Sequence, residues 1–91
     1  MYVEVMKHSI IFHTEDVTTV CSGTLNGIKG ALEGLPFVQC NRCYLVNMKY
    51  VTEVNADEVV VKNERLVISK MRRKEFLQEF NRYIAGGGKL L

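Results

Sequence analysis

The sequence predicts a single domain that is mainly β, with antiparallel sheets and two short helices. Three observations support this fold class. Short runs of β-branched and aromatic residues follow one another at close intervals, separated by polar turn residues. Apolar residues recur at helical spacing in only two stretches. The length of 91 residues suits one domain, and an apolar fraction of 47% is typical of a globular chain.

The first part of the chain predicts an antiparallel meander of three strands. Residues 2–5 alternate between apolar and polar side chains, residues 9–13 are rich in β-formers, and residues 17–21 are mostly β-branched. The breaks at residues 7–8 and 14–16 are short enough for hairpin turns. We therefore expect these strands to pair in chain order.

A short helix is expected next, over residues 25–32. Ser22 or Thr24 can cap its start, and Gly34 can end it. The apolar residues at helical spacing are Leu25, Ile28, Ala31 and Leu32.

Three more strands and a second helix complete the predicted domain. The strands are expected at residues 51–54, 58–62 and 65–69. The second helix is expected from about residue 72 to 85, with an apolar stripe of Phe76, Phe80, Tyr83 and Ile84. The domain should therefore span residues 1–85, and residues 86–91 should form a flexible tail.

Basic residues are clustered, although the formal net charge is only +2. Residues 65–74 hold five basic residues and no acid, and residues 34–52 hold Arg42 and Lys49 and no acid. Such clustering gives a nearly neutral molecule a positive face, as attraction to phosphate requires. The alternative is an ordinary solvated charged surface.

Two segments resemble the LytTR-type DNA-binding domain of bacterial response regulators. Residues 37–47, Phe-Val-Gln-Cys-Asn-Arg-Cys-Tyr-Leu-Val-Asn, are similar to the family's Phe-x-Arg-x-His-Arg-Ser followed by Tyr/Phe-Leu-Val-Asn. Residues 69–76 resemble the Ser-Arg/Lys-x-Arg-type motif before its last helix. Residues 2–5 match its Ile-x-Tyr-Ile-Glu segment, which normally follows a further strand and an N-terminal domain.

The resemblance implies sequence-specific DNA binding for transcription regulation, and no enzymatic activity or cofactor. Family members dock loops and strand ends into successive major grooves of double-stranded DNA, bend the duplex, and typically use two direct repeats. A receiver domain, or another partner, is expected to precede the domain in the full-length protein. The odd number of cysteines argues against a disulfide framework, and no apolar run reaches membrane-spanning length, so we expect a cytoplasmic protein.

Arg42 matches the base-reading part of the first motif. Its guanidinium can donate two hydrogen bonds to the edge of guanine or clamp a phosphate. The motif departs at Gln39, Asn41 and Cys43, where the family carries Arg, His and Ser. Gln39 removes a charge that would contact phosphate, Asn41 can read adenine or hold the loop, and Cys43 replaces a hydroxyl. Asn47 is expected to brace the loop.

Two further contacts are implied near the start of the chain. His8 lies in the first predicted turn, where several family members place a base-contacting side chain. Thr24 resembles a residue that can offer its hydroxyl and a helix-start amide to phosphate, although plain helix capping is equally expected. His13, at the end of a predicted strand, is interpreted as a surface residue.

The second motif implies a further contact loop, beginning at Ser69. Either Lys70 or Arg72 is expected to read a base, because the position that is commonly Arg in the family is Met71 here. Arg73 and Lys74 open the last helix and are expected to meet phosphate. The expected DNA-binding residues are His8, Thr24, Asn41, Arg42, Cys43, Ser69, Lys70, Arg72, Arg73 and Lys74.

Two alternatives stay open at this point. One is a small β-rich module that binds protein or RNA, for which exposed aromatic residues would be expected to stack on bases. The other is a zinc or redox protein built on Cys40 and Cys43. Zinc needs four ligands, and the spacing of Cys21, His8 and His13 fits no common pattern, so no metal site is predicted.

Overall fold

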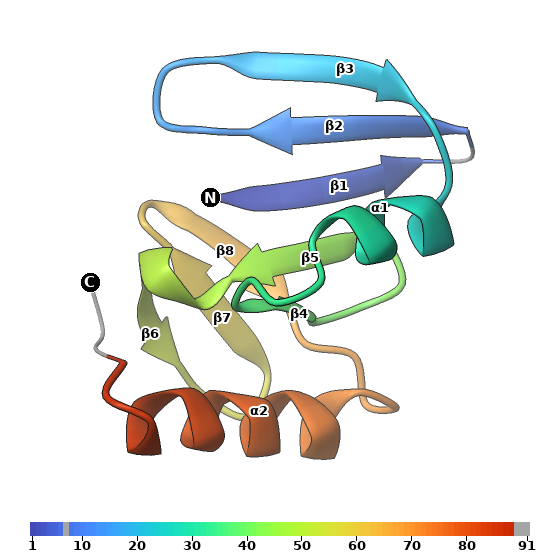
Figure 1. Cartoon of the computed structure of the whole chain (residues 1–91). Helices are drawn as coiled ribbons and strands as arrows, with labels where there is room; N and C mark the ends of the chain where they lie inside the picture. Colours follow the sequence, from blue (N-terminus) through green and yellow to red (C-terminus); the bar gives the residue numbers. More distant parts are fainter. Residues whose placement is uncertain (7, 89–91) are drawn as a thin grey trace.

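Over residues 1–6 and 8–88, which the computed structural model describes, the chain folds into two antiparallel sheets and two α-helices (Figure 1). The five-stranded sheet has the order β3-β2-β1-β5-β4 and contains β1 (Tyr2–Met6), β2 (Ser9–His13), β3 (Thr18–Ser22), β4 (Phe37–Gln39) and β5 (Tyr44–Asn47). The three-stranded sheet has the order β6-β7-β8 and contains β6 (Val51–Val54), β7 (Glu58–Val61) and β8 (Glu64–Val67). The helices are α1 (Leu25–Ala31) and α2 (Arg73–Ala85), and a 3₁₀ turn, η1, spans Met48–Tyr50.

The predicted meander is confirmed in β1, β2 and β3. Val5 pairs with Ile10 across the first hairpin, and Ile11 pairs with Val20 across the second. The β2–β3 turn is closed by the Thr14 hydroxyl, which donates to the carbonyl of Val17 and accepts from its amide. Lys7, in the first turn, lies outside the described residues.

The segment at residues 37–47, for which no strand or helix was expected, forms a hairpin of two strands. Strand β5 pairs with β4 on one side and with β1 on the other, so it lies inside the sheet. These strands are only three and four residues long, too short for a recognisable alternation of side chains. The pairing of Tyr2 with Val46 also joins residues far apart in the sequence.

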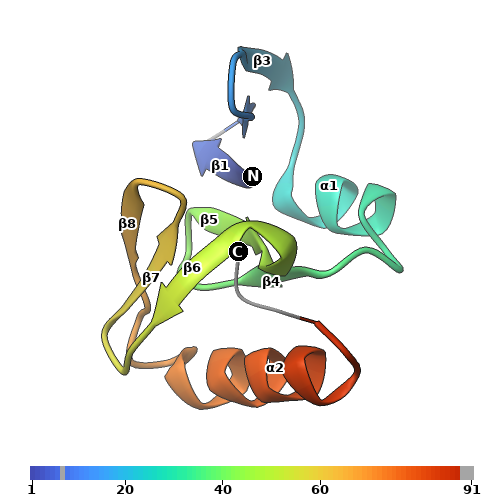
Figure 2. The same cartoon turned by 90° about the vertical axis from the view of Figure 1, so that its left-hand side faces the viewer.

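Alternation along β1 and β5 divides the apolar side chains between two cores. Val3 and Leu45 point to the face that α1 covers, together with Ile10. Tyr2 and Val46 point to the opposite face and pack in the larger core with residues of the second sheet and α2. In Figure 2, α1 and α2 accordingly lie on different sides of the β4–β5 hairpin. The largest fully buried side chains of this larger core are Phe76, Met48 and Ile68.

The helices begin and end close to their predicted residues. Of the two candidate caps, Thr24 is the one used, since its hydroxyl accepts from the Gly27 amide at 3.2 Å. Residues 86–88 do not hang free as the expected tail would, because their amides donate to carbonyls in the last turn of α2. Residues 89–91 lie outside the described residues. Among the described residues, no helix is both long enough and apolar enough to cross a bilayer.

Candidate nucleic-acid interface

Four connecting segments meet at one end of the molecule, on the right-hand side of Figure 1. Backbone hydrogen bonds join them in series. The Gly23 amide donates to the His8 carbonyl (2.8 Å), the Val5 amide to the Cys43 carbonyl (2.6 Å), and the Ser69 amide to the Cys40 carbonyl (2.9 Å). These bonds hold the β1–β2 turn, the β3–α1 link, the β4–β5 loop and the β8–α2 loop side by side. Their residues 8, 23–24, 40–43 and 69–72 are here called the loop surface, in which Cys40 lies buried beneath its neighbours.

Asn41 is the brace of this surface. Its side-chain oxygen accepts from the amides of Cys43 (2.8 Å) and Tyr44 (3.2 Å), and its side-chain nitrogen donates to the Val67 carbonyl (2.8 Å). Since the amide group is engaged at both ends, the geometry favours holding the loop over reading adenine. Asn47 braces the other end of β5 as expected, because its side chain accepts from the Lys49 amide.

Arg42 is exposed at the tip of the β4–β5 loop. Together with Ser69, Met71, Arg72 and Glu75 it lines an open hollow of about 540 Å³. The two predicted motifs, which are far apart in the sequence, therefore face the same space. In the part of the chain that the structure describes, neither Arg42 nor Arg72 makes an ion pair.

The basic residues of the second motif do not all share one environment. Lys70 and Lys74 are exposed, and within residues 1–6 and 8–88 neither of them makes an ion pair. Arg73, by contrast, donates to the Asp57 carboxylate at 2.8 Å and is half-buried. This pairing competes with the phosphate contact expected of Arg73.

Arg65 also lies apart from the loop surface. It approaches Glu53 and Glu58 at 3.7 and 3.6 Å. The fold therefore divides the basic residues at positions 65–74 into two groups. Arg65 and Arg73 lie beside carboxylates, whereas Lys70, Arg72 and Lys74 make no ion pair among the described residues.

The comparisons with known proteins agree with this geometry. The family model described as the LytTr DNA-binding domain matches residues 1–81. The chain belongs to the LytTR family. Its fold is also similar to a solved structure described as the LytTr DNA-binding domain of a methyl-accepting/DNA response regulator from Bacillus cereus, with 21% identity, a TM-score of 0.77, and coverage of 87% of this chain and 78% of that chain. A search of curated proteins gave no match.

Membership of the LytTR family confirms the function class that the two motifs predicted. The domain binds DNA in transcription regulation. The mainly β fold with antiparallel sheets and two helices is confirmed as well.

His8 and Thr24 both reach the loop surface of this LytTR domain. His8 is exposed, and its carbonyl holds the β3–α1 link in place. Thr24 is also exposed, and its hydroxyl is already used as the cap of α1. The capping role of Thr24 is thus visible in the structure, and a contact of either side chain with DNA stays a prediction.

The two cysteines of the C-x-x-C sequence lie in different environments. Cys40 is fully buried in the larger core, and this burial raises the pKa of its thiol to about 12. At neutral pH Cys40 is therefore protonated, whereas metal binding and thiol exchange both need the thiolate. Cys43 is half-buried beside Arg42. The buried thiol argues against the zinc or redox alternative.

Four aromatic or titratable residues form a separate cluster on the sheet. His13, interpreted from the sequence as a surface residue, is half-buried, stacks on Tyr2 and contacts Glu4 at 3.1 Å. Tyr44 donates to the same carboxylate, and burial followed by the Glu4 charge raises the pKa of Tyr44. The four tyrosines and four phenylalanines are all buried or half-buried, so they offer no stacking platform for RNA.

Two residues outside the predicted set belong beside this interface. Met71 is 95% exposed at the tip of the β8–α2 loop, an unusual position for an apolar side chain. Gln39 is 7% exposed, and both polar atoms of its side chain lack a hydrogen-bond partner within the described structure. The sequence signal for both was their departure from the family motifs.

Neighbouring substitutions in the β4–β5 loop should separate bracing from recognition. We expect Asn41→Ala to lower the free energy of unfolding by about 1–3 kcal/mol, because it leaves loop amides without a partner. Arg42→Ala should change it by less than about 0.5 kcal/mol, since Arg42 is exposed and makes no ion pair within the described residues. Urea denaturation of the two variants measures both values. Equal losses in stability would show that Asn41 is not the brace.

The cysteines should differ in their reaction with iodoacetamide at pH 7.5. Cys21, which is exposed, should be modified in the folded protein, whereas Cys40 should react only after unfolding, because burial hides its thiol and keeps it protonated. Peptide mass spectrometry with and without guanidinium reports each site. Rapid modification of Cys40 in the folded protein would contradict the buried, protonated state.

Proposed function

We propose that this chain is the output domain of a response regulator, and that its loop surface reads promoter DNA. The observation that carries the proposal is the placement of Arg42. It is exposed and without an ion pair in the described structure, on a loop that backbone hydrogen bonds tie to the other connecting segments. A rigid support of this kind fixes the direction of a side chain that must match one base pair.

Arg42 is proposed to read guanine in the major groove. The guanidinium presents a planar fork of donors, and the O6 and N7 atoms of guanine accept two of them together. Asn41 is proposed to act through the loop that it braces, and Cys43 to lie close to the DNA backbone. His8 and Thr24 would extend the contact from the adjoining segments.

The β8–α2 loop is proposed to supply the second set of contacts. Lys70 or Arg72 reads a base, and Ser69 and Lys74 meet phosphate. The α2 N-terminus has no side-chain cap, so its first amides are available to an anion. Arg73 contributes less to this footprint than Lys74, because Asp57 already holds it. Met71 can add an apolar contact to a thymine methyl group.

The wider setting is also proposed, with support from family membership. We propose a receiver domain or another signalling partner in the full-length protein, two direct repeats in the DNA site, and a cytoplasmic location. No catalytic role, metal or cofactor is assigned to the chain.

A pair of arginine variants tests base reading. On the best duplex selected from a random pool, Arg42→Ala should lose about 1–3 kcal/mol of binding free energy, and far less on a scrambled duplex. The control is Arg65→Ala, the same chemical change at an arginine held by Glu53 and Glu58, and it should leave both affinities unchanged. Equal losses on both duplexes in the Arg42 variant would make it a phosphate contact.

The salt dependence of binding tests the phosphate contacts. Lys74→Ala should weaken binding to all duplexes about equally, and should reduce the slope of log affinity against log salt by about one unit. Arg73→Ala should reduce the slope less, because its charge is paired with Asp57. Affinities across a salt series provide the slopes. If Lys74→Ala leaves the slope unchanged, the start of α2 does not face DNA.

A further inference from the structure

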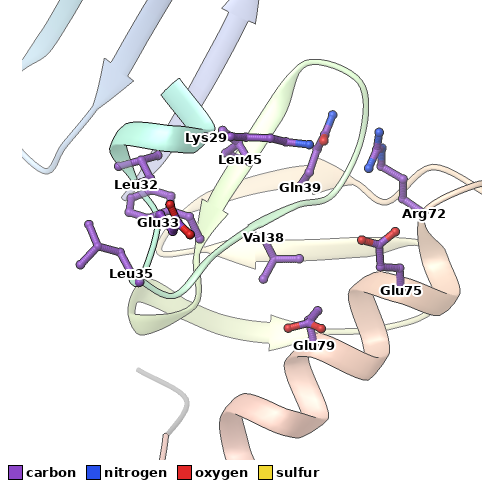
Figure 3. A pocket seen from close by; sticks show the side chains of 12 residues that line it. Lys29, Leu32, Glu33, Leu35, Val38, Gln39, Leu45, Arg72, Glu75 and Glu79 are labelled. Atoms are coloured by element: carbon purple, nitrogen blue, oxygen red, sulfur yellow. The ribbon is translucent and has the colours of Figure 1, made fainter. Parts of the chain in front are cut away.

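A second cavity opens where the five-stranded sheet ends, beside the loop surface. Strand β4 is the edge of this sheet, and its free side lies between α1 and α2. The cavity measures about 300 Å³ and takes its walls from both helices and from β4 and β5 (Figure 3). This volume is at the lower end of the range for small-molecule sites.

The wall of this cavity contains an unpartnered amide. Gln39 lines the cavity with 7% of its surface exposed, and neither its side-chain oxygen nor its side-chain nitrogen has a hydrogen-bond partner in the described structure. A buried amide without partners is costly, and the great majority of buried polar groups are hydrogen-bonded. Both polar atoms are covered by neighbouring atoms, so a polar group that completes the amide from the cavity side must displace part of that cover.

Two cations flank this amide. Figure 3 shows Lys29 extending from α1 toward Gln39 and Arg72 on the other side of it. Over residues 1–6 and 8–88, neither Lys29 nor Arg72 forms an ion pair. An ammonium, an amide nitrogen and a guanidinium together form a donor set for a carboxylate.

The rest of the lining limits what such an anion can be attached to. Apolar side chains cover one part of the wall, among them Leu32 and Val38. Three carboxylates, Glu33, Glu75 and Glu79, cover another part, and they would repel a polyanion such as a nucleic-acid backbone. These carboxylates outnumber the two cations, so the lining fits only a compact ligand whose single negative charge is held between Lys29 and Arg72 and whose remaining body is apolar.

We propose that this cavity binds a small organic carboxylate. The carboxylate lies between Lys29 and Arg72 and accepts from the side-chain nitrogen of Gln39, while the Gln39 oxygen accepts from the Lys29 ammonium. The apolar body of the ligand packs against Leu32 and Val38. This arrangement gives the buried amide partners at both of its polar atoms.

Arg72 connects this site to DNA binding, a step that rests on the proposed function. It lines both the carboxylate cavity and the hollow that contains Arg42. A carboxylate that holds the Arg72 guanidinium withdraws it from the loop surface, so ligand and DNA compete. By linkage, each weakens the other by the same factor.

The binding test uses benzoate as the probe and benzamide, its uncharged analogue, as the control. In ¹H–¹⁵N NMR titrations, benzoate should shift the Gln39 side-chain amide signals and saturate with a Kd on the order of 1 mM, as expected of so small a ligand. Benzamide should bind much more weakly. Lys29→Gln and Arg72→Gln should each lower the affinity for benzoate about tenfold, and Arg65→Gln should leave it unchanged.

Other results would overturn the site. Equal binding of benzoate and benzamide would exclude a carboxylate-selective pocket. A second contrary result would be that benzoate fails to bind and that Gln39→Leu unfolds at a higher temperature than the native protein. The buried amide would then only destabilise the fold, and it would not belong to a ligand site.

A separate measurement decides the coupling to DNA. Roughly 10 mM benzoate should weaken binding of the selected duplex about tenfold in the native protein if the two ligands exclude each other, and only about twofold in Lys29→Gln. Benzoate binding without an effect on DNA affinity would overturn the coupling and support the site. If the native protein shows no preference for the selected duplex over the scrambled one, the proposed function is wrong. The benzoate titration would then still show whether the cavity binds a carboxylate.

Discussion

The β4–β5 hairpin is the constraint on which the rest of the structure depends. Strand β5 pairs with β1, and its side chains Leu45 and Val46 enter different cores on opposite faces of the sheet. The loop of the hairpin bonds to the end of β1 through Cys43 and to the β8–α2 loop through Cys40. A shift of this hairpin by one residue would expose its buried side chains and break these bonds together.

This constraint explains how loops can provide a recognition surface. Loops usually move more than the elements that they connect, which would blur the position of a base-reading side chain. Here Asn41 uses its whole amide to hold the β4–β5 loop against β8, and the side chain of the next residue, Arg42, is exposed. Asn41 thus keeps the loop backbone fixed, while the guanidinium of Arg42 remains available to DNA.

Much of the fold could be predicted from local sequence patterns. Which residues of the loop surface brace the loops, form ion pairs or stay available to DNA could not. Alternation and turn residues located the meander, and helical spacing located α2 to within one residue at its start. The pairings that decide the site join residues distant in sequence. The Arg73–Asp57 ion pair and the bond from Asn41 to Val67 are examples, and no periodicity reports them. Burial of the Gln39 amide without a hydrogen-bond partner among the described residues likewise depends on the fold.

The most direct test of the account maps the DNA-facing surface itself. ¹H–¹⁵N spectra of the domain should be recorded as a selected duplex is added, with a scrambled duplex for comparison. We expect the perturbed amides to gather at residues 8, 23–24, 40–43 and 69–74, and the β2–β3 turn and the C-terminal turn of α2 to stay unperturbed. Perturbations centred on that turn or on the end of α2 would place DNA on another face and contradict the account.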